Sequence, residues 1–141
     1  MSPAPKMRIK SPSCATMAAA RTGWPQCRLI VVFQPHRYTR TRDCFEDFVQ
    51  ILTQADLLLL TEVYPAGEEP IAGASGKNLS QAIRAHGIIE PIFAITVSEL
   101  PKLIDHVAQD GDLILILGAG DIGSMAANLP NLLFSCEGTK I

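Results

Sequence analysis

The sequence lacks the features that assign a chain to several large classes of protein. No apolar run reaches the roughly 18 residues of a membrane-spanning helix, and residues 1–10 hold no apolar segment of the kind found in secretory signals. The four cysteines are far apart and form no CxxC pair, which is typical of reduced thiols rather than of a zinc site or a disulfide framework. The formal net charge of −2 provides no overall attraction to nucleic acid or to an anionic membrane. We therefore expect a cytoplasmic protein with no nucleic-acid or membrane partner.

Common motifs of catalysis are absent as well. The chain has no GxxxxGK[ST] sequence, so it has no P-loop of its own for cradling phosphates. It has no GxSxG nucleophile elbow, and no group of histidines and carboxylates has the spacing of metal ligands. We predict no catalytic residue and no metal site in this chain.

What the sequence does contain is a regular alternation of helix and strand patterns. Its 141 residues are 48% hydrophobic and 18% charged, which favours one domain with buried strands. Amphipathic helical segments alternate with short, continuously apolar runs, which predicts an α/β domain with a mostly parallel sheet. We place the domain at residues 14–130, with tails at residues 1–13 and 131–141. The predicted strands are Arg28–Phe33, Leu57–Thr61, Pro91–Ile95 and Asp112–Leu117, and the predicted helices are Cys14–Thr22, Phe45–Leu52, a short one around Leu79, one capped by Ser98 and one from the glycines after Leu117 to about Asn128.

The loop after the first predicted strand is rich in cations. Its sequence QPHRYTR contains His36, Arg37 and Arg40. Guanidinium groups suit carboxylates and phosphates, and a helical turn would put the two arginines on one side. The loop is thus either an anion clamp or a solvated helix start whose arginines form surface pairs with nearby carboxylates.

Two more unusual loops follow strands, and carboxyl ends of parallel strands meet at one edge. EVYPAGEEP holds Tyr64 and Glu68, and it is either a partner of the cationic loop or a polar surface loop. GAGDIG, from Gly118 to Gly123, matches the GxGxxG dinucleotide fingerprint, but no clear second strand follows it. A tight turn facing a shared site is the interpretation we favour.

Three stretches, residues 18–48, 57–76 and 110–123, resemble the C-terminal domain of the Mur ligases. The runs QPHRYTRT and EVYPAGEEPI are similar to the branch of that family that uses L-alanine, and the resemblance extends over about residues 15–129. It implies a Rossmann-like fold. It also implies a complete enzyme of peptidoglycan synthesis in which an N-terminal domain binds UDP-N-acetylmuramate and a central P-loop domain binds ATP and magnesium.

The resemblance further implies roles for individual residues. His36, Arg37 and Arg40 would hold the carboxylate of L-alanine. The site would be lined by Tyr64, Glu68, Gly118, Ala119 and Gly120. No cofactor would be bound by this chain alone, because the P-loop domain is not part of it.

The sequence departs from the family at its start. The family domain begins with a strand and an Asp-Asp-Tyr-Gly-His-His-Pro-like loop, whereas here MRIKSPSC precedes the first helix. We therefore expect the first strand to be missing, leaving an unpaired sheet edge and reduced stability. The absence of the two upstream domains predicts a fragment that is inactive alone. A stand-alone nucleotide-binding module and a non-functional gene fragment are the alternatives.

Overall fold

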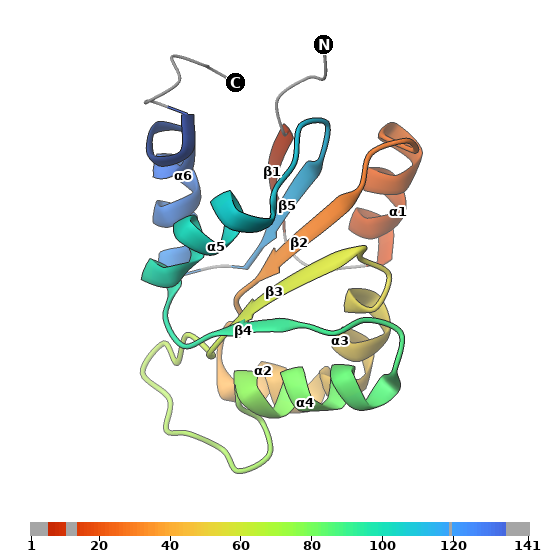
Figure 1. Cartoon of the computed structure of the whole chain (residues 1–141). Helices are drawn as coiled ribbons and strands as arrows, with labels where there is room; N and C mark the ends of the chain where they lie inside the picture. The colour runs from red at the N-terminus through yellow and green to blue at the C-terminus, as the bar shows by residue number, and fades with distance from the viewer. Residues whose placement is uncertain (1–5, 11–13, 119, 135–141) are drawn as a thin grey trace.

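In the part of the chain that the structure describes, five parallel strands form one sheet through the middle of the protein. The computed structural model describes residues 6–10, 14–118 and 120–134. The strands lie in the order β1-β5-β2-β3-β4, and all neighbours are parallel (Figure 1). Their bounds are Lys6–Lys10 for β1, Leu29–Phe33 for β2, Leu57–Thr61 for β3, Ile92–Ala94 for β4 and Leu113–Leu117 for β5. The predicted parallel α/β fold is confirmed.

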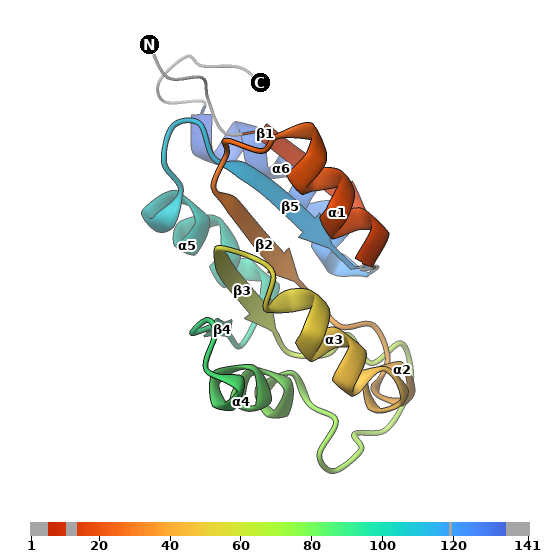
Figure 2. The ribbon, with the colours of Figure 1, turned by 90° about the vertical axis from the view of Figure 1, so that its right-hand side faces the viewer.

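Helices cover both faces of this sheet (Figure 2). On one face lie α1 (Cys14–Gly23), α3 (Phe45–Leu52) and α4 (Gly76–His86); on the other lie α5 (Leu100–Val107) and α6 (Asp121–Phe134). Successive strand residues point to opposite faces, so Val31 joins one apolar cluster and Val32 the other. Burial on both sides explains why β2, β3 and β5 are apolar at nearly every position.

The order of the strands places a crevice beside β2. From β2 the chain proceeds outward through β3 to β4, and it then returns to form β5 on the other side of β2. The helices after β2 and after β5 therefore lie on opposite faces of the sheet. Such a switch point is where open α/β sheets bind ligands.

The segment Lys6–Lys10 corrects two expectations. It forms edge strand β1, paired with β5 from Lys6 beside Leu113 to Lys10 beside Leu117. The prediction of a tail over residues 1–13 is therefore wrong for residues 6–10, and the sheet edge expected to lack a strand has one. Three cations in five residues, between prolines, concealed a strand that pairs through its backbone. The reduced stability expected from an open edge at β5 loses its basis.

Several helix boundaries also differ from prediction. A separate short helix, α2 (Tyr38–Asp43), precedes α3. Ser98 is not a helix cap, because it lies inside the 3-10 turn η1 (Val97–Glu99), where Thr96 and Glu99 form the capping box. Helix α6 continues to Phe134, into the tail predicted over residues 131–141, and residues 135–141 lie outside the described part.

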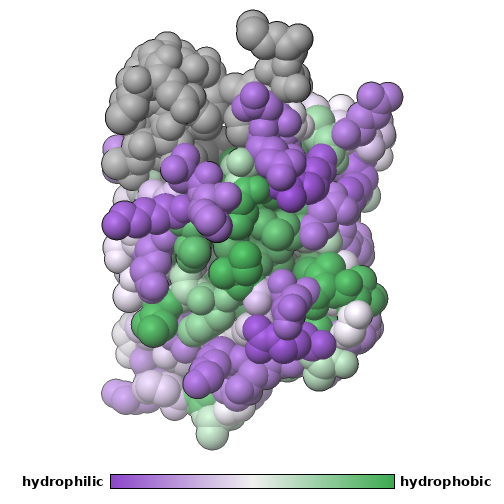
Figure 3. All heavy atoms as spheres, viewed as in Figure 1, coloured by the Kyte–Doolittle hydropathy of each residue, from purple (hydrophilic) through white to green (hydrophobic). Residues whose placement is uncertain are grey.

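Apolar surface gathers beside β4, whose outer side is unpaired within the described residues. Ile88 and Ile95, on either side of β4 along the chain, are 63% and 70% exposed. Figure 3 shows hydrophobic surface across the middle of this face. Within the described ranges, no helix has both the length and the apolar composition of a bilayer span.

Candidate functional site

The loops after β2 and β3 are held together at the carboxyl edge of the sheet. The Arg37 amide donates to the Tyr64 carbonyl, and the Tyr64 amide donates to the Pro35 carbonyl, each over 2.8 Å. These bonds form a parallel bridge between His36 and Tyr64. The two rings stack with centroids 5.5 Å apart and planes 10° from parallel. The structure therefore brings His36 and Tyr64, which are 28 positions apart in the sequence, into one unit.

Arg37 has a backbone conformation that is rare outside glycine. Its φ is 72° and its ψ is 139°, which costs on the order of 1–3 kcal/mol. It stands at the N-cap of α2, where its carbonyl accepts from the Thr41 amide and hydroxyl. Arg40 lies one turn further along α2. Arg37 therefore lies at the cap of α2 and Arg40 lies within its first turn, whereas the spacing had suggested that both are helical.

Both arginines are exposed. Within the described residues, neither guanidinium lies within 4 Å of a carboxylate. The surface pairing considered as an alternative occurs only between Arg42 and Asp43, at 3.0 Å. The guanidinium groups of Arg37 and Arg40 are therefore available to an external anion.

Glu68 ties the loop after β3 to the start of α2. One carboxylate oxygen accepts from the Thr39 amide at 3.1 Å and the other from the Thr39 hydroxyl at 2.6 Å. These hydrogen bonds, helped by the positive charge of Arg37, lower the pKa of Glu68 below its ordinary value. Glu68 was predicted to line the site, and its contacts here are those of a residue that holds α2 in place.

The glycine turn after β5 packs directly against both loops. Gly118 and Gly120 have φ values of 141° and 136°, which favour glycine. A Cβ at Gly118 would lie 2.7 Å from the Gln34 carbonyl oxygen, and a Cβ at Gly120 would lie 2.8 Å from Cγ of Tyr64. The glycines are thus required by protein contacts rather than by a bound pyrophosphate, which weakens the dinucleotide interpretation. Ala119 lies outside the described residues.

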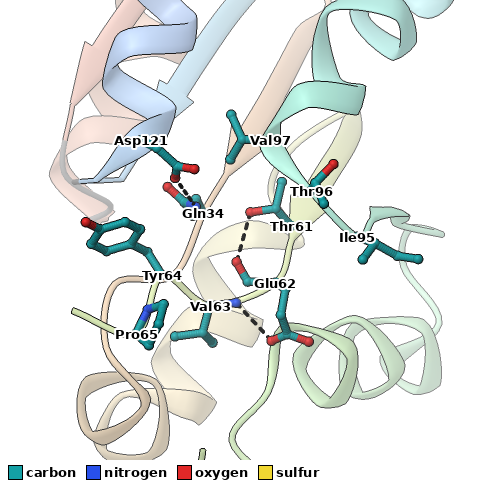
Figure 4. A pocket seen from close by; sticks show the side chains of 10 residues that line it. All are labelled: Gln34, Thr61, Glu62, Val63, Tyr64, Pro65, Ile95, Thr96, Val97 and Asp121. Atoms are coloured by element: carbon teal, nitrogen blue, oxygen red, sulfur yellow. Dashed lines mark hydrogen bonds between the residues drawn. The ribbon is translucent and has the colours of Figure 1, made fainter. Parts of the chain in front are cut away.

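A cleft of about 260 Å³ opens beside these loops. Gln34, which is 4% exposed, donates to Asp121 at 2.6 Å and accepts from the Ile122 amide at 3.2 Å (Figure 4). The Glu62 carboxylate accepts from the amides of Val63 and Gly76 at 2.9 and 2.5 Å. The lining residues are Gln34, Thr61, Glu62, Val63, Tyr64, Pro65, Ile95, Thr96, Val97 and Asp121.

Sequence reasoning missed Gln34 and Asp121 as parts of this site. A polar residue directly after a buried strand is a weak signal, and Asp121 was considered only within a glycine motif.

Burial, and then the charge of Glu62, raises the pKa of the nearby Tyr38 phenol. Within the part of the chain that the structure describes, no three His, Cys, Asp or Glu side chains are grouped as metal ligands would be.

Comparison with known proteins gives one consistent result. Residues 13–120 match the sequence model of the family "Mur ligase, glutamate ligase domain". A UDP-N-acetylmuramate–L-alanine ligase from Methylococcus capsulatus is 57% identical over 121 residues, which are 86% of this chain and 26% of that protein. The enzyme of the same name from Nitrosomonas europaea is 62% identical over 115 residues, or 82% of this chain and 24% of that protein.

Solved structures agree at the level of the fold. The crystal structure of a UDP-N-acetylmuramate–alanine ligase from Thermotoga maritima superposes with a TM-score of 0.70 at 23% identity, over 92% of this chain and 27% of that one. The chain therefore spans about a quarter of the length of the curated relatives it matches.

Proposed function

Because the chain belongs to the Mur ligase family, matching its glutamate ligase domain, we propose that it is the amino-acid-presenting domain of a UDP-N-acetylmuramate–L-alanine ligase. Relatives of that name share more than half of the aligned residues. The proposed role is to hold L-alanine with its amine facing an activated carboxyl group of the sugar substrate. It would act in the bacterial cytoplasm, in peptidoglycan synthesis.

The observation that carries the proposal is that two arginines at the carboxyl end of β2 form no ion pair within the described residues. Arg37 and Arg40 are exposed and have no carboxylate partner in the described structure. A carboxylate accepts two parallel hydrogen bonds from a guanidinium fork, which orients it as well as binding it. His36 adds a ring held in place by Tyr64. The three residues together suit the carboxylate of a small amino acid.

Holding the carboxylate would leave the amine of L-alanine free to react. In the proposed reaction the amine attacks an acyl phosphate of the muramate, the new amide bond forms and phosphate leaves. Positioning of this kind accounts for much of the rate in such transfers. This chain contributes the positioning of one reactant only.

We propose that ATP and magnesium are bound by other parts of the complete enzyme, since this chain spans about a quarter of the length of its relatives. The chain has no P-loop sequence, and its candidate anion groups are the arginines already assigned to the amino acid. We propose that neither ATP nor magnesium is bound by this chain alone. It should release no phosphate from ATP and L-alanine above a heat-treated control.

A titration of the labelled chain with L-alanine, followed by NMR, tests the proposal. The Arg37 and Arg40 side-chain resonances should shift and saturate. Arg37→Gln or Arg40→Gln should weaken binding about tenfold, because each removes a charge-assisted hydrogen bond. Arg42→Gln is the matched control, since Arg42 lies in the same helix but pairs with Asp43. No saturation in the wild type, or equal weakening in the control, contradicts the proposal.

Activity of the reassembled enzyme gives a second test. The N-terminal and central domains of the Methylococcus capsulatus relative, produced as a separate chain, are mixed with this one. Ligation that depends on both chains is expected, and its rate at low L-alanine concentration should fall about tenfold with Arg37→Gln and be unchanged with Arg42→Gln.

A further inference from the structure

Tyr64 connects the glycine turn after β5 to the candidate carboxylate clamp after β2. Its ring is stacked on His36, and the Gly120 backbone leaves no room for a methyl group beside the same ring. Its carbonyl accepts from the Arg37 amide. Tyr64 therefore contacts His36, Arg37 and Gly120.

We propose that Tyr64 and Gly120 are positioning residues, which set the placement of His36 and Arg37 without touching the substrate themselves. This inference rests on the proposed function for its consequence, which is carboxylate binding, but the coupling between the residues can be measured without any ligand. It replaces the expectation that Tyr64 and Gly120 merely line the site.

The contact distances show why the turn controls the ring. A Cβ at Gly120 would lie 2.8, 3.1 and 3.2 Å from Cγ, Cδ1 and Cδ2 of Tyr64. All three atoms belong to a rigid ring, so the added methyl group can be accommodated only by moving the ring or the turn. Two backbone hydrogen bonds of 2.8 Å fix the main chain of Tyr64 to Pro35 and Arg37, so the ring can yield only by rotating off His36 or by taking the loop with it. The first movement removes the stack on His36, and the second displaces the Arg37 amide, so either one disturbs the clamp.

Arg37 is the residue most sensitive to that displacement. Its backbone is held at φ 72°, a conformation that persists only where surrounding contacts impose it. The hydrogen bond from its amide to Tyr64 is one of those contacts. The ring of Tyr64 is needed for the stack, whereas its hydroxyl has no hydrogen-bond partner within the described residues.

The chain offers matched variants for the test. Gly120→Ala and Tyr64→Leu should both disrupt the unit, whereas Tyr64→Phe keeps the ring and should preserve it. Gly123→Ala is the control for an added methyl group in this segment, since a Cβ there meets nothing within 4 Å. Gly111→Ala, at φ 89° and also with nothing within 4 Å, is the control for the backbone strain that alanine meets at Gly120. Tyr64→Leu keeps the test decisive if the alanine at Gly120 prevents folding.

The first readout is the set of imidazole proton resonances, recorded at one pH for every variant. The chain has three histidines, and His86 and His106 are exposed comparators. The stacked Tyr64 ring should place the His36 protons upfield of the other two. Gly120→Ala and Tyr64→Leu should remove this upfield shift and move the Arg37 amide resonance. Tyr64→Phe and the two glycine controls should leave both as in the wild type.

The second readout is the titration with L-alanine. Gly120→Ala and Tyr64→Leu should weaken the binding of L-alanine about tenfold, which is the scale of one lost charge-assisted hydrogen bond. The control variants should bind L-alanine as the wild type does. The coupling between Gly120, Tyr64 and the clamp is overturned if the His36 protons of the wild type show no upfield shift. It is also overturned if the His36 and Arg37 resonances are unchanged in Gly120→Ala. Altered resonances with unweakened binding overturn the positioning role. If the wild type binds no L-alanine while the resonances behave as expected, the coupling stands and the proposed function fails.

Discussion

Replacing Gly76 with alanine tests how α4 and the loop before it are attached to the sheet. A Cβ at Gly76 would lie 2.3 Å from the Thr61 carbonyl oxygen and 2.8 Å from Cα of Glu62, roughly 1 Å short of the ~3.5 Å of ordinary contact. Both atoms are backbone and cannot rotate away. The first turn of α4 must therefore move off the end of β3.

That movement has two costs. Overpacking of this kind costs about 1–3 kcal/mol. The Gly76 amide also donates to the Glu62 carboxylate at 2.5 Å, and a hydrogen bond to a charged group contributes about 1.5–3 kcal/mol. The two costs overlap, because one displacement causes both. We expect the free energy of unfolding to fall by about 3 kcal/mol, and the melting temperature by about 10 °C for a domain of this size.

Urea denaturation followed by circular dichroism measures this loss. Gly123→Ala is the matched control, because a Cβ there meets nothing within 4 Å and alanine is favoured over glycine in a helix by up to about 1 kcal/mol. If Gly76→Ala unfolds within about 0.5 kcal/mol of the wild type, the close packing of α4 on β3 is refuted.

Two further predictions concern an ion pair and a carboxylate. Arg28→Met should lower the free energy of unfolding in urea titrations by about 2–3 kcal/mol, the scale of lost hydrogen bonds to a charged group. Arg28 binds the buried Asp112 carboxylate at 2.7 and 3.2 Å, and the variant leaves that carboxylate with the Gln109 amide as its remaining donor among the described residues. A double variant with Asp112→Leu should recover part of the loss, and an undiminished loss would contradict the reasoning. The hydrogen bonds to Thr39 lower the pKa of Glu68 in the folded state. The stabilisation by Glu68 is therefore present above the pKa that this carboxyl has in the unfolded chain, and it is lost as the pH falls through the lower pKa of the folded state. The difference in urea midpoint between wild type and Glu68→Gln should accordingly shrink between pH 6 and pH 3, and a constant difference would contradict the assignment.

Most of the sheet could be predicted because its signal is local. The strands β2, β3 and β5 are buried on both faces, and a buried parallel strand is apolar at successive positions. The strand β1 escaped prediction because three of its five residues are cations and prolines stand on either side of it in the sequence. Composition reports side chains, so it cannot reveal an edge strand of this kind.

In the candidate site, too, some features could be predicted from the sequence and others could not. The cationic loop, the Tyr64 loop and the glycine turn could be located, because each directly follows an apolar strand. The roles of Gln34 and Asp121 could not be predicted, because their hydrogen bond joins residues 87 positions apart. The family resemblance assigned a substrate group to some of the residues. It did not distinguish the residues that touch the substrate from the residues that hold those residues in place.

By itself, the sequence determined the alternation of helix and strand, the parallel class of the sheet and the edge at which the polar loops gather. These follow from the periodicity of apolar residues within short windows. Only the tertiary structure decided that Tyr64 stacks on His36 and packs against Gly120, and that Arg37 has a positive φ. The reason is that these contacts depend on the order of the strands, which brings β5 back beside β2 after two intervening strands. No local pattern encodes that return.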